Sequence, residues 1–331
     1  MSDRVTNLAS SFNWSAPADH FEANASAHCD QADSSVYPFL LAVYTVVFLV
    51  GLILNGFIMR FYFCEAHQRA PSCIMVYLKN LAAADFLLCL SLPLRISHYA
   101  SRSVTVHLLY CNLGASILYI NIYASIMFMG YIAANRYLKI VHPLGTHILQ
   151  TVQAAHILST VTWVCLLTLL STYVILSFYT QKPITNTVIC ESLQSEQLSI
   201  LYKILHTFSV VTFLVVLISL IFFYYSTSRT LRLVQQRQPA SSSSAKLVKS
   251  HRNMLVLVCV FCFCFVPYHT VRLPGAFLQK NCSWSKVFYY LIELTTFMSV
   301  LNVCLDPLIY FIFCKALRIK INPRWISASS S

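Results

Sequence analysis

Seven long stretches of mostly apolar residues alternate with short polar segments along the chain. Each is long enough to cross a bilayer as an α-helix, which needs about 20 residues to span the hydrocarbon core. Backbone polar groups in lipid must be satisfied within their own segment, so the pattern predicts an all-α membrane protein, a seven-transmembrane helix bundle, and not a barrel. The expected spans are Tyr37–Cys64, Cys73–Tyr99, Leu108–Val141, Val152–Phe178, Gln197–Val234, Leu247–Leu278 and Trp284–Cys314.

Composition supports this interpretation and excludes a water-soluble domain. Hydrophobic residues make up 57% of the 331 residues and charged residues only 10%, and the mean hydropathy is +0.65. The formal charge of +12 reflects basic residues near the ends of the spans, which indicates contact with a membrane surface and no nucleic-acid polymer as partner.

The basic residues also predict the orientation, because they accumulate on the cytoplasmic side of transmembrane helices. They follow the first, third and fifth spans and the last one, and include Arg60, Arg136, Lys139, Arg229, Arg232, Lys249, Arg252, Arg318 and Lys320. The other side carries three glycosylation sequons, at Asn13, Asn24 and Asn281, which are modified only in the lumen. We expect a multi-pass plasma-membrane protein with an extracellular N-terminus.

The chain then divides into three parts. Residues 1–36 form an extracellular, glycosylated segment, residues 37–314 form the helix bundle, and residues 315–331 form a cytoplasmic tail. The tail should begin with a short amphipathic helix over Lys315–Ile321, and Gln235–Lys246 should be a flexible linker between the fifth and sixth spans.

Four of the thirteen cysteines fall on the extracellular, oxidising side: Cys29, Cys111, Cys190 and Cys282. Four cysteines allow three pairings. A bond between Cys111 and Cys190 would hold the loop after the fourth span over the mouth of the bundle, and we expect this pair. A bond between Cys29 and Cys282 would tie the N-terminal segment to the last outer loop.

Polar residues inside the predicted spans require a reason, because they are costly in lipid. Asp85, Ser125 and Asn302 lie in the second, third and seventh spans. Together they would form an oxygen-rich pocket that suits a small hard cation such as Na⁺. The alternative is a hydrogen-bonded water network without an ion, and no other cofactor is expected.

Several motifs on successive spans resemble the rhodopsin-like, class A family of G-protein-coupled receptors. The motifs are Asn55 in "GLILNG", Asp85 in "NLAAADFLL", Cys111, the triplet "NRY", Trp163, "CFCFVPYH" and "NVCLDPLIY". The resemblance covers roughly residues 37–320. Within the family, "YINIYASIMFMGYIAANRYLKIVHP" and "FVPYHTVRLP" resemble the branch of the ADP-type purinergic, platelet-activating-factor and lysophosphatidylserine-type receptors.

The resemblance implies roles for residues toward the cytoplasmic side. Arg136 would hold the closed state and then contact a heterotrimeric G protein when the sixth helix moves outward; the coupling residues would be Asn135, Arg136 and Tyr137. The activation switch would comprise Phe265, Pro267, Asp306, Pro307 and Tyr310. Two positions depart from the family: Asn135 replaces an acidic residue, and Phe265 replaces a tryptophan.

Basic side chains near the outer mouth predict an anionic ligand, because a cationic cluster attracts phosphate or carboxylate. They are Arg95, Arg102, Lys203, His269, Arg272 and Lys280, whereas Glu293 is the acid expected inside the upper bundle. His269 and Arg272 resemble the phosphate-binding pair of nucleotide receptors. Ile292, however, occupies a position at which those receptors carry a lysine.

A lysophospholipid or related lipid is therefore the first expectation for the ligand, and a nucleotide is the alternative. Tyr119 and Tyr123, with Phe208, Phe288 and Tyr289, would offer aromatic surface. A decoy receptor that binds without signalling shares all these features. The chain contains no spacing typical of a catalytic site and no internal repeat typical of a transporter, so neither class is expected.

Overall fold

A computed structural model describes residues 36–62, 72–101, 103–141, 150–180, 195–237, 242–278, 282–314 and 317. Within these residues, seven helical spans are long and apolar enough to cross a membrane. This confirms the predicted bundle. The glycosylation sequons, Cys29, Cys190, Arg102, Lys280 and most of the expected tail helix lie outside the described residues.

The first four spans contain six helical elements. They are α2 (Tyr37–Arg60), α3 (Cys73–Ala100), α4 (Val104–Leu109), the π-helical η5 (Tyr110–Gly114), α5 (Ala115–Val141) and α6 (Val152–Thr180). The third span thus begins at α4, four residues before the predicted start, and includes a π-helical stretch that the apolar pattern does not reveal.

The remaining spans consist of α7 (Glu196–Arg237), α8 (Ser242–Leu278), α9 (Cys282–Val300) and α10 (Asn302–Phe313). The linker prediction is wrong for most of its length, because α7 continues to Arg237 and α8 already begins at Ser242. The seventh span is interrupted at Leu301, where the amides of Cys304 and Leu305 both bond to the Leu301 carbonyl.

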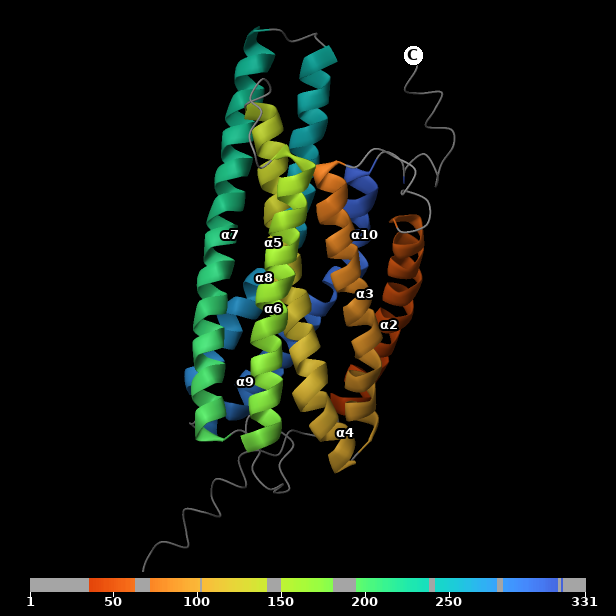
Figure 1. Cartoon of the computed structure of the whole chain (residues 1–331), viewed down its shortest axis with the longest axis vertical. Coiled ribbons are helices and arrows are strands. Elements are labelled where there is room, and N and C mark those ends of the chain that lie inside the picture. Colours follow the sequence, from red (N-terminus) through yellow and green to blue (C-terminus); the bar gives the residue numbers. More distant parts are fainter. Residues whose placement is uncertain are drawn as a thin grey trace, which may run out of the picture.

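The helices run side by side, and α7 and α8 project beyond the others at the end opposite α4 (Figure 1). The spans of α3 and α5 are the most buried, whereas α6 exposes apolar side chains over most of its surface. A helix that is apolar on all sides but uncovered by protein faces lipid. Thus α3 and α5 form the interior of the bundle and α6 lies at its periphery.

Prolines lie inside three helices, Pro93 in α3, Pro267 and Pro274 in α8, and Pro307 in α10. Each removes a backbone donor from the helix ladder, which weakens that turn without ending the helix. Each of these prolines therefore makes a point at which a continuous helix can bend.

Close packing joins α2, α3 and α10 around Gly51. The Asn55 amide donates to the carbonyls of Val303 at 2.8 Å and Gly51 at 3.0 Å. A Cβ atom added at Gly51 would lie 2.6 Å from Val303 Cγ1 and 3.1 Å from Cys89 Sγ. The absence of a side chain at Gly51 therefore lets α10 approach α2.

We predict that Gly51→Ala lowers the thermal stability of the purified receptor chain, by an overpacking cost of about 1–3 kcal/mol. Gly56→Ala is the matched control, because nothing lies within 4 Å of its added Cβ. Both substitutions gain the same helix propensity, so only the clash differs. Equal melting temperatures for the two variants would contradict this account.

Candidate functional site

A cavity of about 180 Å³ lies in the half of the bundle that contains α4, with walls from α3, η5, α5, α6, α7, α8 and α9. Six tyrosines contribute to its walls: Tyr110, Tyr119, Tyr173, Tyr202, Tyr268 and Tyr289. An apolar wall consists of Leu118, Leu169, Leu170, Leu205 and Ile292. Tyrosine combines an apolar ring with a polar tip, so the cavity can accept a ligand that is part apolar and part polar.

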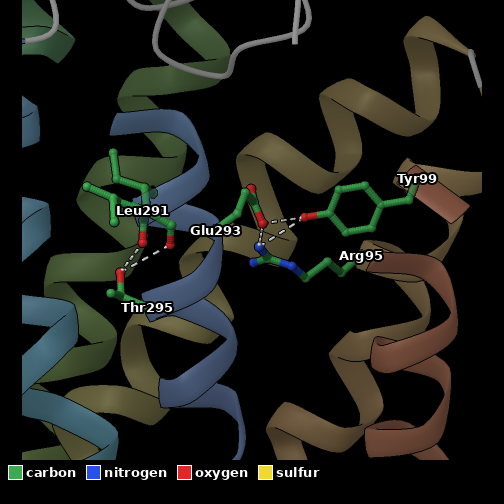
Figure 2. Close-up of polar contacts among 6 residues, drawn as sticks. Arg95, Tyr99, Leu291, Glu293 and Thr295 are labelled. Atoms are coloured by element: carbon green, nitrogen blue, oxygen red, sulfur yellow. Dashed lines mark hydrogen bonds and ion pairs between the residues drawn. The ribbon is translucent and has the colours of Figure 1, made fainter. Parts of the chain in front are cut away.

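An ion pair crosses one side of the cavity from α3 to α9 (Figure 2). The Arg95 guanidinium lies 2.7 Å from the Glu293 carboxylate, and the Tyr99 hydroxyl donates to the same carboxylate oxygen at 2.7 Å. Arg95 also lies over the Tyr44 ring, 4.6 Å from its centroid, and is only 5% exposed. A charge so buried is tolerated because the opposite charge is in direct contact.

Arg272 approaches the cavity from α8. Its Nε donates to His206 Nε2 at 3.4 Å, and its guanidinium carbon lies 5.8 Å from the Tyr202 ring centroid. His206 Nδ1 donates to the Tyr202 carbonyl at 3.1 Å, which leaves Nε2 as the acceptor. Neutral groups thus orient Arg272 at the cavity wall.

His269 and Tyr123, which were expected to contact the ligand, are not among the residues that line the cavity, so their role in binding stays a prediction. His269 is buried behind the wall, where Nδ1 donates to the Phe265 carbonyl at 2.8 Å and Nε2 lies 3.0 Å from the Tyr123 hydroxyl. The Phe213 ring stacks on the imidazole with 4.0 Å between centroids. This pair links α5 to α8 beneath the cavity.

Four of the six predicted ligand residues do line the cavity: Arg95, Tyr119, Arg272 and Glu293. Of the other candidates, Tyr289 is in the lining, whereas Phe208 is 62% exposed and faces lipid, and neither Phe288 nor the half-buried Lys203 reaches the cavity. Sequence reasoning missed His206, although a histidine within an apolar span is a signal of function.

A second polar cluster lies deeper in the bundle and joins α3, α5 and α10. The Asn121 amide donates to Asp85 at 3.4 Å, and the Asn302 amide donates to Ser125 at 3.2 Å and to Asn121 at 3.3 Å. The Tyr310 hydroxyl also donates to Asp85. The predicted trio of Asp85, Ser125 and Asn302 is therefore brought together, with Asn121 as a member that the sequence did not single out.

This deep cluster contains a buried oxygen that lacks a hydrogen bond. Oδ1 of Asn302 has no hydrogen-bond partner among the described residues, and the fully buried carboxyl group of Asp306 contacts that of Asp85. Buried acceptors without donors are unfavourable unless water or a cation satisfies them. The cluster is therefore suited to a cation that binds oxygen.

The coupling and switch residues lie toward the end opposite α4. The Arg136 guanidinium lies over the Phe313 ring at 5.0 Å, and Tyr137 stacks on Phe223 at 4.8 Å. Asn135 is 2% exposed, and neither atom of its amide has a hydrogen-bond partner among the described residues. Asn135 thus provides none of the charge that an acidic residue would place beside Arg136.

The switch residues occupy the interior between α8 and α10. Phe265 is fully buried with its ring edge-on to Phe261, and the Ser299 hydroxyl ties α9 to the Cys264 carbonyl at 2.9 Å. Pro267 lies one turn from this contact, and Asp306, Pro307 and Tyr310 continue along α10. Phe265, Asp306 and Tyr310 are therefore all buried in the core of the bundle.

Cys111 is disulfide-bonded. Its expected partner, Cys190, lies outside the described residues, so the pairing stays a prediction, as does the pairing of Cys29 with Cys282. The described cysteines with free thiols are Cys73, Cys89, Cys165, Cys259, Cys262, Cys264, Cys304 and Cys314. These lie within or at the ends of the helices, as expected for the cysteines on the reducing side or in lipid.

Comparison with known proteins identifies relatives along most of the chain. Residues 54–310 match the family described as 7 transmembrane receptor (rhodopsin family). Purinoceptor 14 of Bos taurus is 34% identical over 283 residues, which cover 83% of this chain and 82% of the relative. G-protein coupled receptor 87 of Mus musculus is 33% identical over 307 residues, which cover 88% of this chain and 80% of the relative.

A third relative has lower identity. Probable G-protein coupled receptor 34 of Mus musculus is 28% identical over 294 residues, which cover 88% of this chain and 77% of the relative.

Proposed function

Because the chain belongs to the rhodopsin family of seven-transmembrane receptors, we propose that it binds an extracellular anionic ligand in the α4-side cavity and activates heterotrimeric G proteins at the opposite end. The family consists of receptors, so the chain is not an enzyme. The observation that carries the ligand proposal is the charge of the lining. Among the described residues, two arginines and one carboxylate line the cavity.

The carboxylate of Glu293 already forms an ion pair with Arg95. The lining therefore retains net positive charge, in a cavity whose apolar walls lower the local dielectric. An anionic group entering beside Arg272 would gain a charge-assisted hydrogen bond. A cationic ligand would meet repulsion from Arg272 at the same wall.

An anionic lysophospholipid or related lipid is the ligand class that fits these walls best. The apolar wall of Leu118, Leu169, Leu170 and Leu205 lies on α5, α6 and α7, and would cover an acyl chain while Arg272 holds the head group. Burial of the chain would add about 0.8 kcal/mol per CH₂ group.

A nucleotide is the second candidate, supported by two observations. The six tyrosines offer ring faces on which a base could stack, and a purinoceptor is 34% identical to this chain. Ile292 weakens this candidate, because an apolar side chain lines the cavity beside Glu293 where a second cation would stabilise a polyphosphate.

The proposed function also implies an orientation of the bundle in the membrane. The end that carries α4 would be extracellular, and the end at which α7 and α8 project would be cytoplasmic. The basic residues that follow α2, α5 and α10 support this placement, as does the disulfide at Cys111 on the α4 side, because disulfides persist in the oxidising exterior.

The ligand proposal is tested by Arg272→Ala in cells that express the receptor. Lysophospholipids and nucleotides are screened with G-protein dissociation as readout, and the active compound is titrated on both variants. Removing a charge-assisted hydrogen bond costs about 1.5–3 kcal/mol, or roughly a ten- to hundredfold loss of potency.

Lys203→Ala is the matched control. Lys203 is a cation that follows the lining residue Tyr202 on α7, but it does not line the cavity itself. Its potency should match the wild type. Unchanged potency of Arg272→Ala at equal surface expression would place the anionic group elsewhere. A response to cationic ligands alone would overturn the proposed ligand class.

We also propose that Na⁺ binds the deep polar cluster. Asp85 would supply the charge, and the oxygens of Ser125, Asn302 and Asp306 would supply neutral or anionic donors. The support is the buried Oδ1 of Asn302, which has no hydrogen-bond partner among the described residues, and the contact between the buried carboxyl groups of Asp85 and Asp306. Oxygen donors suit a hard cation, which the cationic end of the cavity would not hold.

If Na⁺ binds there, agonist affinity should change with Na⁺ concentration in the wild type, and Asp85→Asn should abolish this dependence. The isosteric amide retains the shape of the side chain but removes its charge. Replacing Na⁺ by a large organic cation at constant ionic strength controls for screening. An undiminished Na⁺ effect in Asp85→Asn excludes Asp85 as the ion's ligand.

Coupling to the G protein would involve Arg136. The residue before it, Asn135, would influence how firmly the receptor is held in its closed resting state. A carboxylate at position 135 could hold Arg136 by an ion pair, whereas the neutral Asn135 amide has no hydrogen-bond partner among the described residues. Weaker restraint reduces the free-energy gap between closed and open states, and about 1.4 kcal/mol changes their ratio tenfold.

We therefore predict measurable ligand-independent signalling that falls in Asn135→Asp and disappears in Arg136→Ala. Basal nucleotide exchange on the G protein, measured at matched surface expression, reports the effect. Arg136→Ala separates signalling from background, since it removes the contact with the G protein. An equal basal signal in the wild type and Asn135→Asp would show that the missing carboxylate does not set the resting state.

A further inference from the structure

Two histidines face each other at the rim of the cavity. His98 lies in the last turn of α3, and His107 lies in α4, with their Nδ1 atoms 3.1 Å apart. Their rings are 4.9 Å apart between centroids and inclined at 30°. His98 also lines the cavity. The pair is therefore positioned where an ion from outside could reach it.

The distance between the two nitrogens suits a shared metal ion. Zn²⁺ binds histidine nitrogens at about 2.0–2.1 Å, so two of them at a tetrahedral angle lie about 3.3 Å apart. A shift of about 0.2 Å would bring His98 and His107 to that spacing. The same distance also fits a direct hydrogen bond between two neutral rings, which a bound Zn²⁺ would replace.

A neighbouring sulfur packs against the His107 ring. Sγ of Cys111 lies 3.6 Å from Nε2 of His107 and 4.0 Å from Nδ1. These two distances place the sulfur beside the imidazole and away from the axis of either N–H bond, so the sulfur holds the ring in position without selecting a tautomer.

The neighbours also hold His98 in place. The Tyr110 ring stacks on it with 4.5 Å between centroids and 17° between planes. Arg95 lies one turn earlier on α3 and would repel a cation, but Glu293 at 2.7 Å offsets its charge. No third histidine, cysteine or acid joins the pair among the described residues.

We propose that His98 and His107 bind a zinc-type transition-metal ion that bridges α3 and α4 at the cavity rim. Two protein ligands leave two positions of a tetrahedral ion open, and water fills them in the receptor without ligand. Because His98 lines the cavity, the anionic group of the ligand can replace a water on the metal. This last step rests on the proposed function, whereas the metal site itself does not.

Direct binding tests the metal site without any agonist. The full-length receptor is purified with a tag that contains no histidine, stripped with EDTA, and titrated with Zn²⁺ in competition with a fluorescent zinc indicator. His98→Asn and His107→Asn should each weaken binding at least tenfold, since asparagine keeps a polar contact but is a poor zinc ligand. His156→Asn is the control, because His156 is exposed on α6, far along the chain from the pair.

Three outcomes overturn the site: no zinc binding by the wild type, equal binding by the wild type and both variants, or equal competition by Mg²⁺, which prefers oxygen ligands. A zinc-dependent rise in the melting temperature of the wild type, reversed by EDTA and absent in the double variant, supports it independently of expression level.

Agonist titrations with and without Zn²⁺ then test the link to the ligand. Zinc should increase the potency of an anionic agonist in the wild type and in His156→Asn but not in His98→Asn. Zinc binding without any response to anionic ligands would overturn the proposed function and leave the metal site standing. A normal response to anionic ligands without zinc binding would overturn the metal site and leave the proposed function standing.

Discussion

Hydrocarbon offers no hydrogen bonds, and this constraint accounts for the arrangement of the bundle. Each polar group within a span must find a partner on a neighbouring helix. The buried Arg95 pairs with Glu293 across the cavity and donates to the Tyr99 hydroxyl on its own helix. Polar pairs therefore act as the specific contacts between helices whose remaining surfaces are uniformly apolar.

These contacts form separate levels along the bundle axis. The ion pair of Arg95 and Glu293 lies at the cavity wall. The pair of Tyr123 and His269 lies beneath the cavity, and the cluster around Asp85 is deeper still. Each level joins α3 or α5 to α8, α9 or α10. A ligand that changes one level can consequently alter the packing of the next, because adjacent levels share the same helices.

Sequence reasoning located the helices and the depth of each polar residue, but not their rotation about the helix axes. The trio of Asp85, Ser125 and Asn302 was predictable because costly polar residues at similar depth must meet in the interior. The orientation of Phe208 was not, since an apolar residue faces lipid or protein equally well. The partners of His269 were not predictable either, because a polar side chain in the interior can bond to any of several neighbouring helices. The ion pair spans 198 residues of sequence, and no local pattern encodes such a contact.

The predicted helix boundaries were wrong for a related reason. The serines of 242–244 are typical of a linker, but they precede the basic, helix-forming stretch that begins α8, and the helix extends back through them. The π-helical residues Tyr110–Gly114 have the same apolar character as an α-helix. Composition distinguishes neither case, because the difference lies in backbone hydrogen bonding.

The length of α8 makes it a lever. Pro267 is 25 residues from the start of the helix at Ser242, so the arm between them is about 38 Å long at 1.5 Å per residue. A tilt of about 10° at Pro267 would displace the tip by about 6–7 Å, by the same helix geometry. At the projecting end of α8 (Figure 1), a small change of angle beneath the cavity would thereby become a displacement of several ångströms.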